Sequence, residues 1–102
     1  VETPDPIRGI YAAVARKQLD GTPDSGWYPE ERMTVEETVR AYTAGAAMAS
    51  ADELTRGTLV RGSFADMTIL SRDIFSTPAA EILDVRVAAT VIAGQFMFRE
   101  GI

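Results

Sequence analysis

The sequence predicts an α+β fold in which helices precede strands. Apolar residues recur at helical spacing through much of the first half, and one stretch there opens with a capping-box pair. After Asp52 the helical repeats give way to short β-prone runs separated by glycines. These observations divide the chain into a helical part, residues 1–52, and a strand-rich part, residues 53–102.

The first helix is predicted from Pro6 to about Gln18. Asp5 can accept backbone N–H bonds as the N-cap, and the fixed backbone angle of Pro6 suits the first helical turn. Gly21 and Pro23 then end the helix. The residues at helical spacing are Ile7, Ile10, Tyr11, Val14 and the stem of Lys17.

The segment from Asp20 to Met33 is predicted to be a long ordered loop. It contains two glycines and two prolines, which punctuate secondary structure. The only tryptophan of the chain lies there, in Gly26-Trp27-Tyr28-Pro29.

Thr34 and Glu37 predict that a second helix starts near Val35. Their spacing is that of a capping box, in which the threonine side chain and the glutamate side chain each accept the backbone N–H of the other residue. The helix is predicted to end by Ser50. Small residues on one stripe, together with Gly45, imply that a helix or sheet approaches closely. The stripe consists of Val39, Tyr42, Thr43, Ala46 and Ala47.

The second half is predicted to be mainly strand. The first candidates are Thr58 to Val60 and Met67 to Leu70, joined by a turn around Arg61-Gly62-Ser63. Pro78 to Leu83 is predicted to form a short helical turn.

The last two strands are predicted to form a hairpin. They run from Val85 to Ile92 and from Gln95 to Arg99, with Ala93-Gly94 at the turn. Large apolar residues near the strands are interpreted as alternating inward-facing residues of the sheet, not as a cofactor site. They are Phe64, Met67, Phe96, Met97 and Phe98.

Composition disfavours several functional classes. The 102 residues carry a formal net charge of −5 with neither sign gathered into a long block, which disfavours nucleic-acid binding. The longest uncharged apolar stretch, Val87 to Gly94, is too short to span a bilayer, and no basic region followed by an apolar core opens the chain. We therefore expect a cytoplasmic protein that does not bind membranes.

The chain contains neither histidine nor cysteine. A Ser-His-Asp triad, a cysteine nucleophile and a thiolate metal site therefore cannot be built from it. Carboxylates remain as candidate groups. Glu30-Glu31 and Glu36-Glu37 are interpreted as solvated first-turn residues, because adjacent helical residues do not face each other. Asp66 could be a metal ligand, but a role in binding backbone N–H groups is favoured. Asp52 and Asp84 are interpreted as boundary residues.

Several short motifs resemble the amidohydrolase superfamily. Those in the second half look like the closing segment of these enzymes, where the chain leaves the barrel and completes a small β-sandwich. They are Gly57-Thr58-Leu59, Gly62, Ala65 to Asp73 and the hairpin Val87 to Phe98. Those in the first half are similar to the YtcJ-like branch, which includes N-substituted formamide deformylases. They are Pro4-Asp5-Pro6, Gly9 to Val14, Gly26 to Glu30 and Arg40 to Thr43.

The resemblance implies an α+β fragment of a larger enzyme. Residues 1–52 would be the last helices and loop of a metal-dependent hydrolase TIM barrel, and residues 53–102 would be strands of the accompanying small β-sandwich. Val1 is similar to the valine of the family's Ser-Asp-x-Pro-Val stretch, whose aspartate binds metal and handles the proton of the attacking water. That aspartate and the other family ligands would precede Val1. We therefore assign no catalytic residue, metal ligand or cofactor to this chain, and expect a divalent metal, zinc, in the complete enzyme.

Trp27 and Tyr28 have two interpretations within this resemblance. As residues of a loop at the catalytic face of a barrel, they could contact the substrate, because aromatic side chains provide large contact areas. The simpler interpretation, which we favour, is that both rings pin the long loop onto the barrel.

We therefore expect the C-terminal scaffold portion of a metal-dependent amidohydrolase that acts on carbon–nitrogen bonds other than peptide bonds. The chain alone would be inactive. Its expected partners are the upstream barrel and, through exposed apolar surface, other copies of itself. The alternative is a stand-alone, non-catalytic interaction or oligomerisation module derived from the same fold.

Overall fold

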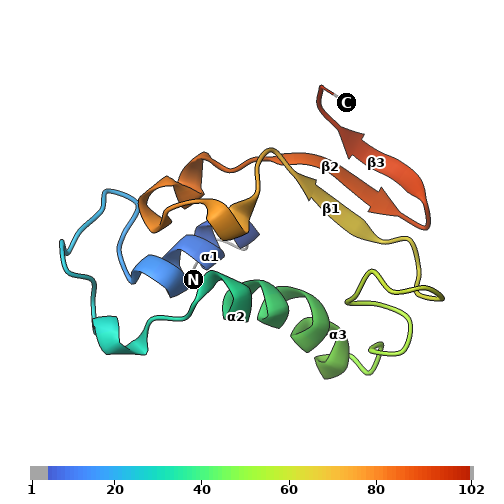
Figure 1. The fold of residues 1–102 in the computed structure, drawn as a ribbon, viewed down its shortest axis with the longest axis horizontal. Helices are drawn as coiled ribbons and strands as arrows, with labels where there is room; N and C mark the ends of the chain where they lie inside the picture. Colours follow the sequence, from blue (N-terminus) through green and yellow to red (C-terminus); the bar gives the residue numbers. More distant parts are fainter. Residues whose placement is uncertain (1–4, 102) are drawn as a thin grey trace. The chain divides into compact units, whose positions relative to one another are not determined.

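A computed structural model describes residues 5–101 and shows helices followed by a three-stranded antiparallel sheet (Figure 1). The described chain divides into two compact units, residues 5–39 with 72–85 and residues 40–71 with 86–101. The predicted α+β class is confirmed. The assignment of residues 1–52 to a barrel and 53–102 to a sandwich refers to a longer protein and stays a prediction. The predictions made for Val1 and Pro4 lie outside the described residues.

Helix α1 (Pro6–Ala15) starts as predicted but ends earlier. The Asp5 side chain accepts the Ile7 N–H at 3.0 Å, which confirms the N-cap. Arg16 follows in the left-handed conformation, with φ 57°, and its N–H bonds the Ala12 carbonyl. The predicted extension to Gln18 is wrong because the chain turns away at Arg16.

The first unit has its core where α1 packs against the 3₁₀ helix η4 (Ala79–Asp84). This element confirms the helical turn predicted at Pro78 to Leu83, whereas η3 (Ile74–Ser76) was not predicted. Ile82 in η4 is completely buried, which contributes about 1.5–3 kcal/mol to folding. The other buried apolar residues of this unit are Ile10, Tyr11, Ala15, Ile74 and Val85.

The second helical stretch consists of α2 (Val35–Arg40), the π-helical η2 (Ala41–Gly45) and α3 (Ala46–Ala49). The capping box is confirmed in both directions, since the Glu37 N–H bonds the Thr34 hydroxyl at 3.0 Å and the Thr34 N–H bonds the Glu37 carboxylate at 2.8 Å. The end at Ser50 is also confirmed. The π-helical turn was not predicted.

The predicted small-residue stripe is only partly buried. Ala47 is buried, whereas Tyr42, Thr43 and Ala46 are exposed. Close approach does occur at Ala44 and Ala47, where the approaching residue is Gly57, which belongs to the irregular segment of residues 52–66. A Cβ added at Gly57 would lie 2.7 Å from the Ala47 Cβ and 3.0 Å from the Ala44 Cα.

The sheet contains β1 (Met67–Leu70), β2 (Val87–Ile92) and β3 (Gln95–Arg99), in that order. Figure 1 shows the three strands side by side, with β2 in the centre. The predicted hairpin is confirmed, with positive φ at both Ala93 (52°) and Gly94 (77°), as a tight two-residue turn requires. Its first strand begins at Val87 and not at Val85 as predicted, because Val85 caps η4.

The strand predicted at Thr58 to Val60 is wrong, and the second half is less strand-rich than expected. The Phe64 N–H bonds the Thr55 carbonyl at 2.8 Å, so the chain between them closes into a loop. The turn predicted around Gly62 is present, and a bond from the Ser63 N–H to the Val60 carbonyl closes it. Thr58 to Val60 therefore lie on an exposed loop and not in the sheet.

The prediction that the aromatic residues of the last strand point inward is wrong. Every residue of β3 is exposed, and Phe96 and Phe98 are 50% and 47% exposed. The pairing shifts between Thr90 and Val91, because Val91 pairs with Phe96 and Thr90 with Phe98, which leaves Met97 as the extra residue of a β-bulge. Successive residues of a strand face opposite sides, so this bulge places Phe96 and Phe98 on opposite faces of the sheet.

We predict that Gly57→Ala destabilises the protein more than Gly62→Ala. Both glycines have similar positive φ, 92° and 96°, so each alanine costs about 1–2 kcal/mol of backbone strain. Only the Gly57 substitution also forces a clash with the helix, which adds about 1–3 kcal/mol. Urea denaturation followed by circular dichroism measures the difference. Equal losses of unfolding free energy in the two variants would show that Gly57 does not lie this close to the helix in solution.

We also predict that acid weakens the capping box. The hydrogen bond from the Thr34 N–H, followed by that with the Thr34 hydroxyl, holds the pKa of Glu37 below its usual value. The resulting stabilisation is fully present above the usual glutamate pKa, about 4.3, and disappears as the pH falls through the lower folded pKa. Glu37→Gln should therefore show a flatter dependence of unfolding free energy on pH over this range. A pH slope as steep in Glu37→Gln as in the unchanged protein would show that the capping box does not contribute to it.

Candidate functional site

The most distinctive side-chain arrangement in the loop after α1 is a pair of perpendicular aromatic rings. The rings of Trp27 and Tyr28 have centroids 4.7 Å apart and an interplanar angle of 84°. We call this pair the aromatic corner. The Arg16 guanidinium carbon lies 5.0 Å from the centre of the Trp27 ring, within the range of a cation–π interaction.

Backbone bonds hold the aromatic corner against the end of α1. The Trp27 N–H donates to the Arg16 carbonyl at 2.7 Å, and the Arg16 Nε–H donates to the Trp27 carbonyl at 2.9 Å. Gly26 is buried with φ 85°, and an added Cβ would lie 3.0 Å from the Ala15 carbonyl oxygen. The loop can therefore come this close to the helix only with glycine at position 26.

Further bonds order the rest of the loop. The Asp20 carboxylate accepts the Thr22 hydroxyl at 2.7 Å and the Thr22 N–H at 3.0 Å. These bonds, the hydroxyl first, lower the pKa of Asp20. At the other end, the Met33 N–H bonds the Ala13 carbonyl at 3.0 Å. The long loop is therefore ordered, as predicted.

Both rings of the aromatic corner are exposed in the described chain. Trp27 is 62% exposed and Tyr28 57% exposed. Within this chain, backbone hydrogen bonds and Arg16 fasten the loop, and the rings contribute little burial. Their roles toward a substrate or a barrel stay predictions. The sequence interpretation missed Arg16, whose signal was only that a basic residue sits at the predicted end of the first helix.

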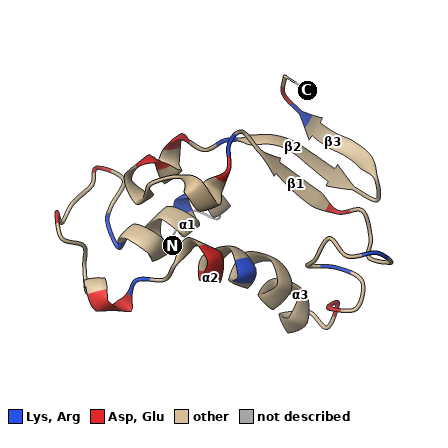
Figure 2. Ribbon diagram, in the orientation of Figure 1, with Lys and Arg blue, Asp and Glu red and all other residues tan. Residues whose placement is uncertain are grey.

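The paired glutamates do not form a site. Glu30 and Glu31 lie exposed in the 3₁₀ helix η1 (Pro29–Glu31), and Glu37 is engaged in the capping box. Figure 2 shows acidic and basic residues scattered along the described ribbon. Within residues 5–101 no group of three or more His, Cys, Asp or Glu side chains could hold a metal ion.

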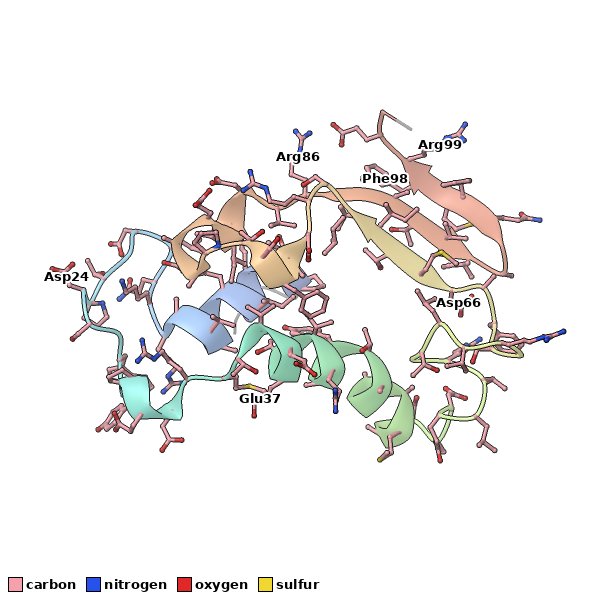
Figure 3. All side chains as sticks on the ribbon, viewed as in Figure 1. Asp24, Glu37, Asp66, Arg86, Phe98 and Arg99 are labelled. Atoms are coloured by element: carbon pink, nitrogen blue, oxygen red, sulfur yellow. The ribbon has the colours of Figure 1, made fainter. Side chains whose placement is uncertain are left out.

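Asp66, the other carboxylate singled out from the sequence, joins the irregular segment to the hairpin (Figure 3). Its Oδ1 accepts the Ala93 N–H at 2.9 Å, and its Oδ2 lies 3.3 Å from the Arg56 Nε. The adjacent bond from the Gly94 N–H to the Ala65 carbonyl, 2.9 Å, strengthens the same connection. The favoured prediction, that Asp66 binds backbone N–H groups, is confirmed.

The two predicted boundary residues also follow the expected pattern. Asp52 comes directly after α3, where its N–H bonds the Ala47 carbonyl at 2.8 Å and its side chain accepts the Ser50 hydroxyl at 3.0 Å. Asp84 is the last residue of η4. Neither belongs to a metal-binding group of the described residues.

We predict that Asp66→Ala lowers the free energy of unfolding by about 1–3 kcal/mol, because it removes a charged acceptor from the Ala93 N–H. Asp66→Asn keeps an acceptor oxygen and loses mainly the ion pair with Arg56, which is partly exposed and worth about 0–1 kcal/mol. Urea denaturation of both variants, with exposed Asp24→Ala as the control, tests this ranking. A loss as large in Asp66→Asn as in Asp66→Ala would assign the effect to charge instead.

No helix among the described residues is long and apolar enough to cross a membrane.

Comparison with known proteins gives a consistent result. The chain matches the model of the amidohydrolase family over residues 1–98. It is 33% identical over 100 residues to the putative amidohydrolase YtcJ of Bacillus subtilis (strain 168), covering 98% of this chain and 19% of that protein. It is 30% identical over 92 residues to the N-substituted formamide deformylase of Arthrobacter pascens, covering 90% of this chain and 16% of that protein. The chain thus spans less than a fifth of the length of these relatives. No solved structure gives a significant match.

Proposed function

Because the chain belongs to the amidohydrolase family, we propose that it is the C-terminal scaffold portion of a metal-dependent enzyme that hydrolyses carbon–nitrogen bonds other than peptide bonds. The observation that carries the proposal is the family match over residues 1–98. The named relatives support the choice of bond, since one is called an amidohydrolase and the other an N-substituted formamide deformylase.

The described residues do not fit the divalent metal that the family implies. They contain no cluster of three or more metal-binding side chains, and the chain has neither histidine nor cysteine. We therefore assign no catalytic step to the described residues. In the proposed enzyme, zinc and its ligands belong to the remaining part of the protein, which would form the barrel.

The proposed contribution of this chain is mechanical. Capped helix α2 and the sheet provide ordered elements, and large apolar side chains are available for contacts with the rest of the protein. The most exposed of these are Leu54 (89%), Leu59 (73%), Met48 (67%) and Met97 (63%). Apolar side chains in such numbers are a common feature of surfaces that pack against another polypeptide.

The same exposed apolar side chains are consistent with a second candidate function. A stand-alone interaction or oligomerisation module would use these side chains to contact another copy of the chain. The proposed cytoplasmic location applies to both candidates.

The test compares the 102-residue chain with the longer gene product that contains it. Both are assayed against N-substituted formamides, with and without added zinc and after treatment with a chelator. We expect chelator-sensitive hydrolysis by the longer protein and none by the chain. Stoichiometric zinc binding and amide hydrolysis by the chain alone would refute the scaffold role. A longer protein without amide hydrolysis would refute the proposed reaction.

Light scattering distinguishes the second candidate. A module made for oligomerisation should give one discrete dimer or higher oligomer and unfold cooperatively on heating. A scaffold separated from its barrel should instead associate without a fixed stoichiometry and bind dyes that report apolar surface.

A further inference from the structure

We propose that the aromatic corner, Trp27 and Tyr28, is a preorganised contact site for a flat, uncharged aromatic group, and that Arg16 is the positioning residue that fixes the Trp27 ring. The inference rests on the proposed function, because it assigns the site to an aryl substituent on the amide substrate of the complete enzyme.

The Trp27 peptide is fixed on both sides, because its N–H and its carbonyl each hydrogen-bond Arg16. Arg16 itself is held by its position at the end of α1, where its N–H bonds the Ala12 carbonyl at 2.9 Å. The guanidinium thus binds the Trp27 backbone and also lies over the Trp27 ring. Loss of Arg16 would release both constraints together.

The rings of Trp27 and Tyr28 are exposed. More than half of the surface of each residue is open to solvent, although the backbone below them is fixed. A ring that already has a fixed direction loses little conformational entropy when a ligand binds. Trp and Tyr also offer large apolar contact areas with few rotatable bonds. The aromatic corner therefore has the properties of a contact site.

Two nearly perpendicular rings can contact a third ring by stacking on one ring and by an edge-to-face contact with the other. The Arg16 charge, close to the Trp27 ring, opposes a cationic group. Glu30 and Glu31 in η1 add two negative charges, and Arg32, whose Nε–H donates to the Pro29 carbonyl at 2.9 Å, adds a positive one, so together with Arg16 these charges cancel. A neutral aryl group fits this combination best.

The direct test uses the fluorescence of Trp27, the only tryptophan. The 102-residue chain is titrated with acetanilide, a neutral aryl amide, and with N-cyclohexylacetamide as the matched non-aromatic probe. We expect acetanilide to quench the Trp27 fluorescence saturably. We also expect acetanilide to bind about fivefold more tightly than the cyclohexyl amide. Equal affinity for the two probes, or no saturation with either, would overturn the proposal.

Variants test the role of each residue. Tyr28→Ala and Arg16→Ala should each weaken acetanilide binding about fivefold. Arg16→Lys should not restore it, because an ammonium group lacks the planar fork that bonds the Trp27 carbonyl while lying over the ring. Phe75→Ala removes another exposed aromatic ring and should leave the affinity unchanged.

A positioning role predicts a further spectroscopic effect. Arg16→Ala should reduce the near-ultraviolet circular dichroism of the coupled rings at temperatures where the variant is still folded, while the far-ultraviolet spectrum stays the same. Loss of the hydrogen bond to the Trp27 carbonyl should also lower the melting temperature by a few degrees. An unchanged near-ultraviolet spectrum of the folded variant would refute the positioning role.

The longer gene product separates this inference from the proposed function. In that protein, Trp27→Ala should raise KM for an anilide relative to a cyclohexylamide about fivefold, with kcat changed less than about twofold. Absence of all amide hydrolysis refutes the proposed function, while the titration still decides whether the corner binds aryl groups. The inference is refuted if Trp27→Ala leaves the ratio of the two KM values unchanged in an active protein and acrylamide does not quench the fluorescence of Trp27. Those results would show that the aromatic corner is an internal packing contact.

Discussion

A small interior is the constraint on which the rest of this structure depends. In the described residues, Ile82 is the only large side chain that is completely buried, and three of the other buried apolar positions are alanines. A chain of about a hundred residues buries a smaller share of its surface than a large domain does. Burial therefore supplies limited stabilisation, and each hydrogen bond that fixes an irregular segment becomes proportionately more important.

Those hydrogen bonds occur where regular secondary structure is missing. The loop after α1 is fastened by Arg16, and the segment after α3 is fastened at one end by Asp52 and at the other by Asp66. Between these two aspartates, Gly57 approaches the helix more closely than any other residue type could. In both regions, a polar side chain bonds a backbone group from a part of the chain that is distant in sequence. This arrangement orders long loops without requiring a larger core.

Features that a few neighbouring residues determine could be predicted from the sequence. The Asp5 cap, the capping box of Thr34 and Glu37, and the hairpin turn at Gly94 all follow from local backbone chemistry. The failures concern non-local contacts. Thr58 to Val60 have strand-forming residues but lie in a closed loop, and Phe96 has the pattern of an inward residue but is half exposed, with the Arg99 guanidinium 4.9 Å from the centre of its ring.

The residues of the candidate site also divide into those that the local sequence indicates and those that depend on non-local contacts. Trp27 and Tyr28 could be singled out because large aromatic residues in a loop are conspicuous in a sequence. Arg16 could not, since its contact with Trp27 spans eleven positions and depends on the left-handed turn that ends α1. The helical spacing of apolar residues predicted that this helix extends to Gln18, so Arg16 was expected inside the helix and not at its end. The residue that orients the ring became visible only when the position of the helix end was known.

The family relationship explains why these two kinds of feature can be separated in one chain. Locally determined caps and turns form wherever the sequence is present, so they need no other part of the protein. The faces of β3 and the side chains of Leu54 and Leu59 are exposed in the described residues, and the relatives are more than five times as long as the matched region. Under the proposed function, other parts of a longer protein would cover this apolar surface. The aromatic corner differs from that surface in one respect: its backbone is already fixed by hydrogen bonds within the chain, so its geometry does not depend on any further contact.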